Sequence, residues 1–183
     1  MDIWNKVELK IQELARGVSS NEMYILILCE VGSQRKLPLL LSRDEAQYIM
    51  ALMMSSGEFR PILNNTLHKI TSAYGIIIDE VLLIETKDGS CKARVSMYQC
   101  GQLEQIVVDS AEAVILSLTY RCPIFASPKL LESTTVQNNG GTMIAIPMKT
   151  LSVELLREAL NRAIKEENYE LASQLRDEIN RRT

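Results

Sequence analysis

The sequence of 183 residues is poor in several features that mark common classes of protein. It has a single histidine, a formal net charge of −3, and four cysteines without a CxxC pair. The weak acidity disfavours a broad nucleic-acid-binding surface, because Lys and Arg must neutralise phosphates in such binding. Any nucleic-acid site must therefore be a local patch. The cysteine spacing favours buried, reduced thiols over a zinc site or a disulfide framework.

Long apolar runs and nucleotide-binding loops are also missing. No run approaches the length of a membrane span, and the opening MDIWNK lacks the basic and apolar regions of a signal peptide. We therefore expect a cytoplasmic protein without membrane contacts. The chain has no glycine-rich phosphate loop and no Ser, His, Asp arrangement. His68 stands alone on an expected helix, which favours a structural or solvent-facing role over acid–base work.

The clearest positive signal is a strand that runs directly into a helix. Residues 37–41 alternate as a strand, and Pro38 predicts its start or an edge position because proline cannot donate a ladder hydrogen bond. Ser42 and Glu45 then form a capping box. The helix after it has an apolar face made of Ala46, Ile49, Met50, Met53 and Met54. This face suits a sheet, and its methionines suit a core or an oligomer interface.

The rest of the first 130 residues mixes strands and helices. Strands are expected at 7–11, 23–31, 76–85, 91–99 and 103–108, with a short edge strand at 122–126. A helix opened by Pro61 should pack through Ile62, Leu63, Thr66, Leu67 and Ile70, and Asp109 with Glu112 caps a third helix. This order predicts an α+β fold, with a mixed, largely antiparallel sheet packed by two or three helices and followed by a helical hairpin.

The composition changes after residue 130. Residues 131–150 are rich in Ser, Thr, Asn and Gly, and they predict a flexible linker between a domain of residues 1–130 and a hairpin of residues 151–183. The hairpin should turn at Glu167 and Asn168. Because so short a hairpin buries little apolar area, we expect it to pair with a copy or a partner.

The hairpin resembles a UVR motif, which occurs in the UvrB and UvrC subunits of bacterial excision repair. The resemblance rests on Leu156, Leu160, Ala163, Tyr169, Glu170, Ala172, Leu175, Arg176, Asp177 and Ile179. It implies contact with another UVR-containing protein or with a second copy. The residues that would make this contact are Leu156, Leu160, Tyr169, Leu175, Arg176 and Asp177.

The first 130 residues resemble the bifunctional nuclease family, also called domain of unknown function 151. The resemblance is carried by LPLLLSRDEAQYIMALM, by ArgPro at 60 and 61, by the strand pair from Ile76 to Met97, and by AEAVILSL followed by CPIF. It implies a bacterial, commonly homo-oligomeric nuclease that acts on DNA and RNA. The family usually has x-Thr-His-Asp after ArgPro, where this chain has Ile62, Leu63, Asn64 and Asn65. The family's Arg-Pro-Ser-Asp-Ala is replaced here by residues 109–113, which keep an acid at the fourth position and lose the arginine.

Metal-assisted hydrolysis of a phosphodiester needs carboxylates that hold a divalent cation such as Mg²⁺ or Mn²⁺. Glu45, Asp109 and Glu112 are the candidate metal ligands and catalytic residues, and helix capping alone would also explain their spacing. The candidate nucleic-acid-binding residues are Arg60, Lys92 and Arg94. The replacements at Asn64 and Asn65 favour an alternative, a catalytically degenerate scaffold that works through its UVR hairpin.

Overall fold

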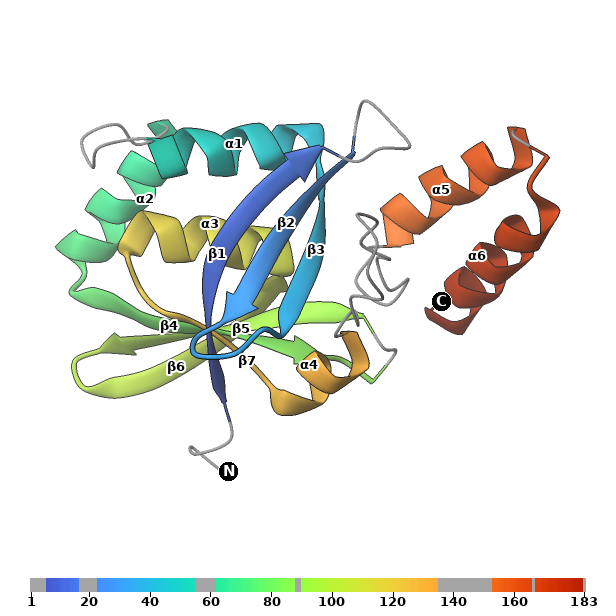
Figure 1. The fold of residues 1–183 in the computed structure, drawn as a ribbon. Helices are drawn as coiled ribbons and strands as arrows, with labels where there is room; N and C mark the ends of the chain where they lie inside the picture. The colour runs from blue at the N-terminus through green and yellow to red at the C-terminus, as the bar shows by residue number, and fades with distance from the viewer. Residues whose placement is uncertain are drawn as a thin grey trace.

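Seven strands form one sheet in the order β3-β2-β1-β7-β4-β5-β6 (Figure 1). The computed structural model describes residues 6–16, 23–54, 62–87, 90–134, 153–165 and 167–182. The strands are β1 (Val7–Arg16), β2 (Met23–Glu30), β3 (Lys36–Ser42), β4 (Ile76–Glu85), β5 (Cys91–Gln99), β6 (Gln102–Asp109) and β7 (Ile124–Ala126). The helices are α1 (Arg43–Met54), α2 (Ile62–Ala73), α3 (Ser110–Tyr120), α4 (Pro128–Thr134), α5 (Val153–Lys165) and α6 (Tyr169–Arg182). The predicted α+β class is confirmed.

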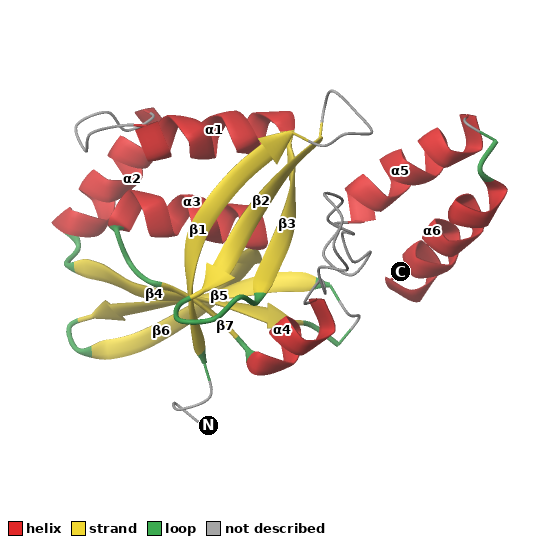
Figure 2. Ribbon diagram, in the orientation of Figure 1, coloured by secondary structure: helices red, strands yellow, loops and turns green. Residues whose placement is uncertain are grey.

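The sheet is antiparallel except for the pair β4 and β7. The prediction of an edge strand at 122–126 is wrong, because Ile124 pairs with Leu9 on one side and with Val81 on the other. A strand of only three residues is too short for its sequence pattern to distinguish a central strand from an edge strand. It is central because the chain returns to the middle of the sheet after α3. Pro38 does lie in an edge strand, β3, as predicted. Figure 2 shows β1, β2 and β3 crossing the view steeply while β4, β5 and β6 lie across it, so the sheet is strongly twisted.

One face of the sheet, the inner face, carries the main core. Alternate residues of the strands point inward and are covered by α1, α3 and α4. The largest fully buried members of this core are Leu26, Leu28, Leu37, Leu39, Leu41, Ile49, Leu83, Leu130 and Leu131. Helix α4, which the sequence patterns missed, starts at the end of β7 and adds Leu130 and Leu131. No helix in the described ranges is long and apolar enough to cross a membrane.

Helix α2 is turned opposite to the prediction. Leu63 is 75% exposed and Ile70 is 49% exposed, whereas Asn64 and Thr71 are buried. The predicted core face of α2 is therefore wrong. The methionines of α1 differ in the same way, since Met50, Met53 and Met54 are exposed and Ala46, Ile49 and Leu52 are buried. The polar side chains of α2 face inward because they hydrogen-bond to α1 and α3.

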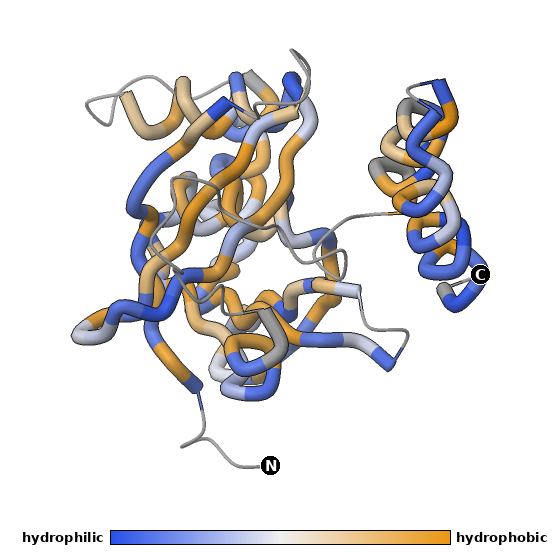
Figure 3. Tube along the Cα trace, turned by 45° about the vertical axis from the view of Figure 1, so that its right-hand side comes forward, coloured by the Kyte–Doolittle hydropathy of each residue, from blue (hydrophilic) through white to orange (hydrophobic). Residues whose placement is uncertain are grey.

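Helices α5 and α6 form the predicted hairpin, with a turn at Glu167 and Asn168. Glu167 has a left-handed φ of 55°, and Asn168 Oδ1 accepts a hydrogen bond from Leu171 N at 3.2 Å. Apolar and polar segments alternate along both helices (Figure 3). One buried cluster connects the hairpin with the outer face of β3, and Met23 and Ile25 of β2 pack against this cluster. In this cluster Leu40 lies with the hairpin residues Leu156, Ala163, Ala172, Leu175 and Ile179.

All four cysteines are free thiols. Cys91 is buried, Cys29 and Cys122 are half-buried, and Cys100 is exposed in the turn between β5 and β6. The expectation of buried thiols is therefore wrong for Cys100. Cys100 and Gly101 both have positive φ, 49° and 79°, as in a two-residue type I′ turn.

Candidate nucleic-acid interface

The first predicted carboxylate, Glu45, closes the start of α1. Its Oε2 accepts hydrogen bonds from Ser42 N at 2.7 Å and from Ser42 Oγ at 2.8 Å. Ser42 Oγ in turn accepts from Glu45 N at 3.3 Å. The capping box read from the sequence is therefore complete, and it occupies one oxygen of the carboxylate.

The other two carboxylates, Asp109 and Glu112, cap α3 at the end of β6. They form a capping box, in which Asp109 N donates to Glu112 Oε2 at 3.2 Å. Asp109 also forms an ion pair with Lys92, which lies opposite it on β5. Both side chains of this pair are at least 40% exposed, so the pair contributes little stability.

The places of these carboxylates in the fold bear on the predicted metal centre. In the ranges that the structure describes, no three His, Cys, Asp or Glu residues are grouped so that they could hold a metal ion. Glu45 lies in α1, which follows the edge strand β3. Asp109 ends the opposite edge strand, β6, and Glu112 lies in α3, which follows β6. Their roles as ligands and catalytic residues remain predictions.

Asn64, which stands where the family motif has another residue, is a buried structural group. It accepts a hydrogen bond from Tyr48 OH at 2.6 Å and donates one to Thr119 Oγ1. Thr119 donates onward to Ile115 O at 2.7 Å. A polar chain thus joins α1, α2 and α3, and burial raises the pKa of Tyr48. Sequence reasoning missed this role, although the departure from the motif marked the position.

His68 also has partners on neighbouring elements. Its ring stacks on Tyr120 with centroids 5.5 Å apart, and its Nδ1 lies 3.4 Å from Ser72 Oγ. Tyr120 OH in turn hydrogen-bonds to Thr71 Oγ1 at 3.1 Å. These contacts support the structural role expected from the sequence.

Arg94 lies on the outer face of β5, as the alternation of the strand predicts. In the register it lies between Leu82 of β4 and Val107 of β6, and Phe125 of β7 lies beyond Leu82. Arg94 is half-buried among these apolar side chains. Within the described ranges it forms no ion pair, whereas Lys92 is paired with Asp109. Of the predicted basic residues, Arg60 lies outside the described residues.

Aromatic side chains flank Arg94 on this face. Tyr98, four residues along β5, is 37% exposed and lies between Ile77 and Leu103 in the register. On the other side, Lys6 Nζ lies 4.4 Å from the centroid of the Phe125 ring and pairs with Glu80. Figure 1 shows α1, α2 and α3 on the opposite side of β4, β5 and β6. The outer face therefore presents the guanidinium of Arg94, which has no ion-pair partner among the described residues, between the ring of Tyr98 and the half-buried ring of Phe125.

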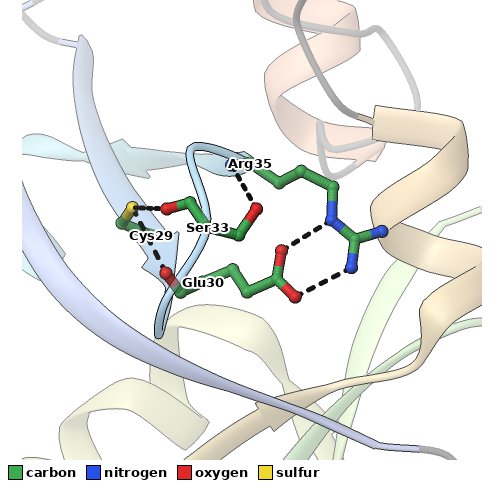
Figure 4. A network of polar contacts seen from close by, with 4 residues as sticks. All are labelled: Cys29, Glu30, Ser33 and Arg35. Atoms are coloured by element: carbon green, nitrogen blue, oxygen red, sulfur yellow. Dashed lines mark hydrogen bonds and ion pairs between the residues drawn. The ribbon is translucent and has the colours of Figure 1, made fainter.

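The turn between β2 and β3 holds a second polar network, shown in Figure 4. Arg35 donates two hydrogen bonds to Glu30, from Nε to Oε2 at 2.6 Å and from Nη2 to Oε1 at 2.8 Å. The hydrogen bond from Arg35, with help from Ser33, lowers the pKa of Glu30 to about 2. Because the two charges pair within the turn through a two-pronged contact, the network fixes the conformation of the turn.

The structure divides the predicted partner-binding residues of the hairpin into two groups. Leu156, Leu160 and Leu175 belong to the cluster against β2 and β3 or pack on it. Tyr169, Arg176 and Asp177 are exposed, and the last two lie 3.5 Å apart as an ion pair. Whether any of them binds a partner remains a prediction.

Comparison with known families gives two matches. The sequence profile of the bifunctional nuclease domain matches residues 26–139, which is more than half of the 183 residues. The profile of the UvrB/uvrC motif matches residues 151–181. No curated protein matches the chain. Both resemblances drawn from the sequence are confirmed, and with them a nuclease-like or nucleic-acid-binding role.

Proposed function

Because the chain belongs to the bifunctional nuclease domain family, we propose that it binds single-stranded nucleic acid on the outer face of β4, β5 and β6, while its UVR hairpin contacts protein. The observation that carries this proposal is Arg94. A half-buried guanidinium that has no carboxylate partner in the part of the chain that the structure describes offers a planar fork that matches a phosphate. The net charge of −3 argues against a large duplex footprint and is compatible with one such contact.

The rings beside Arg94 would supply the remaining affinity. Proteins that bind single strands stack bases on aromatic side chains, at about 1–3 kcal/mol per base. Tyr98 is exposed on the same face and can receive a base, and Phe125 extends the row beyond Leu82. Such stacking tolerates any sequence, so we expect weak preference among bases and strong dependence on salt.

The test is fluorescence anisotropy with a labelled single-stranded RNA or DNA. Arg94→Glu should weaken binding about tenfold or more, since a hydrogen bond to a charged group contributes about 1.5–3 kcal/mol. Lys69→Glu, on exposed α2, makes the same charge change away from this face and should leave affinity almost unchanged. Equal affinities of wild type and Arg94→Glu would contradict the proposal.

Metal-dependent hydrolysis is a second candidate, which family membership favours and the capping geometry does not. Its test is cleavage of the same oligonucleotides with Mg²⁺ or Mn²⁺. Glu45→Gln keeps an oxygen for Ser42 and removes the charge that a metal needs, and Glu112→Gln does the same at α3. Cleavage that both variants abolish without loss of folding would support these ligands. No cleavage by the wild type would leave binding and protein contact as the functions.

A further inference from the structure

A row of polar side chains crosses the outer face of β4, β5 and β6. In the strand register, Ser96 of β5 lies between Glu80 of β4 and Gln105 of β6. Because side chains on one face of a strand are two residues apart, this polar row lies about 7 Å along β5 from Arg94 on one side and from Tyr98 on the other. The row therefore separates the group proposed to hold a phosphate from the ring proposed to hold a base.

Gln105 is held in one orientation within the polar row. Its Nε2 donates a hydrogen bond to Ser96 Oγ at 3.1 Å. Ser96 is 4% exposed, so its hydroxyl needs a partner from the protein, whereas Gln105 is exposed. An amide group has one donating and one accepting end, and the donating end of Gln105 is bound to Ser96. Gln105 therefore presents its Oε1, a hydrogen-bond acceptor, in the row next to Tyr98.

The charges on this face favour the sugar of a bound strand at the polar row. Glu80 pairs with Lys6, and this pair leaves no net attraction for a phosphate in the row. A phosphate at Arg94 and a base on Tyr98 leave the sugar, which is uncharged and joins the two, next to Gln105. The order of the rows along β5 is thus the order of the groups within a nucleotide.

On the basis of the proposed function, we infer that Gln105 Oε1 accepts a hydrogen bond from the ribose 2′-hydroxyl, so that this face prefers single-stranded RNA to single-stranded DNA. The 2′-hydroxyl is the group by which a protein distinguishes RNA from DNA at a given site. Gln105 is then a specificity-determining residue, and Ser96 is a positioning residue that holds its amide. Because stacking on Tyr98 accepts every base, the preference concerns the sugar alone.

The test is fluorescence anisotropy of the full chain with labelled oligonucleotides of equal length that differ only in the sugar. They are oligouridine, oligodeoxyuridine and 2′-O-methyl oligouridine. Deoxyuridine lacks the hydroxyl, and the methyl ether keeps the oxygen but cannot donate. The wild type should bind oligouridine about three- to tenfold more tightly than either of the others, which is the effect of one hydrogen bond.

Three variants assign the preference to Gln105. Gln105→Leu removes the acceptor, so it should bind oligouridine no more tightly than oligodeoxyuridine, with the wild-type affinity for oligodeoxyuridine. Ser96→Ala should reduce the preference in part, because it frees the amide of Gln105 to rotate. Gln102→Leu is the matched control, since it makes the same change on the opposite face of β6 and should keep the full preference. Circular dichroism checks that each variant is folded.

The outcomes separate this inference from the proposed function. Equal wild-type affinities for oligouridine and oligodeoxyuridine, or an undiminished preference in Gln105→Leu, would overturn the role of Gln105 alone, provided that Arg94→Glu still weakens binding. A wild type that binds none of the oligonucleotides, or that binds them equally well after Arg94→Glu, would overturn the proposed function and the role of Gln105 together.

Discussion

Replacing Asn64 by alanine should lower the free energy of unfolding, because Asn64 connects α1, α2 and α3 by hydrogen bonds. The side chain is 6% exposed, accepts from Tyr48 OH, and donates to Thr119 Oγ1. Thr119 keeps its own bond to Ile115 O, and the half-buried Tyr48 hydroxyl can turn towards water, so neither partner carries the full penalty of an orphaned group. Two lost hydrogen bonds at about 1 kcal/mol each, plus the vacated volume, give about 2–3 kcal/mol.

Thermal unfolding followed by circular dichroism measures this loss. For a chain of this size, about 2–3 kcal/mol corresponds to a fall in Tm of roughly 5–10 °C. Asn65→Ala is the matched control, because Asn65 is the exposed neighbour on the same helix, and it should change stability by less than about 0.5 kcal/mol.

A double-mutant cycle with Thr119→Val separates the bond from general packing. If Asn64 and Thr119 act through their mutual bond, the double variant should be less destabilised than the sum of the single variants by about 0.5–3 kcal/mol. Additive effects, or an Asn64→Ala protein as stable as Asn65→Ala, would refute the idea that this chain fixes α2.

Three further predictions concern the cysteines, the Glu30–Arg35 pair and the contact between β3 and the UVR hairpin. Cys100 should react with iodoacetamide in the native protein, whereas Cys91 should react only on unfolding, because burial raises its pKa to about 12; peptide mass spectrometry distinguishes them. Glu30→Gln should cost stability near pH 7, and the cost should shrink as pH falls below about 4.5 towards 2, since the folded-state pKa is lowered by Arg35; melting temperatures against pH check this. Leu40→Ala should remove about 2–3 kcal/mol from the contact under the UVR hairpin, and hydrogen exchange should then rise in α5 and α6 before α1 and α3.

The elements that could be predicted from the sequence are those specified by neighbouring residues. The capping boxes at Ser42 and Asp109 involve residues three apart, so their spacing was sufficient to place α1 and α3 directly after strands. The outward direction of Arg94 followed from simple alternation along β5. In each case the determinants lie within one turn or one strand.

The rest depended on contacts between distant residues. The central place of β7 rests on pairing with strands 115 and 43 residues away at Ile124, which no local pattern reveals. The rotation of α2 rests on Asn64 and Thr71 finding partners on other helices, and these bonds outweighed the apolar pattern of the helix itself. The carboxylates were predicted as one site because they share a local motif, although α1 and α3 leave the sheet from opposite edges.

The position of the UVR hairpin limits how it can meet a partner. Leu156 and Leu175 are almost fully buried, and the cluster that holds them includes Leu40 of β3. A partner that binds this apolar side must first displace the hairpin from its own sheet and offset the burial lost there. A partner that leaves the hairpin in place meets instead the exposed Ile164, Tyr169 and Leu171 beside the turn. The two modes differ in energy by the contact with β3, so weakening that contact should favour the first mode and leave the second unchanged.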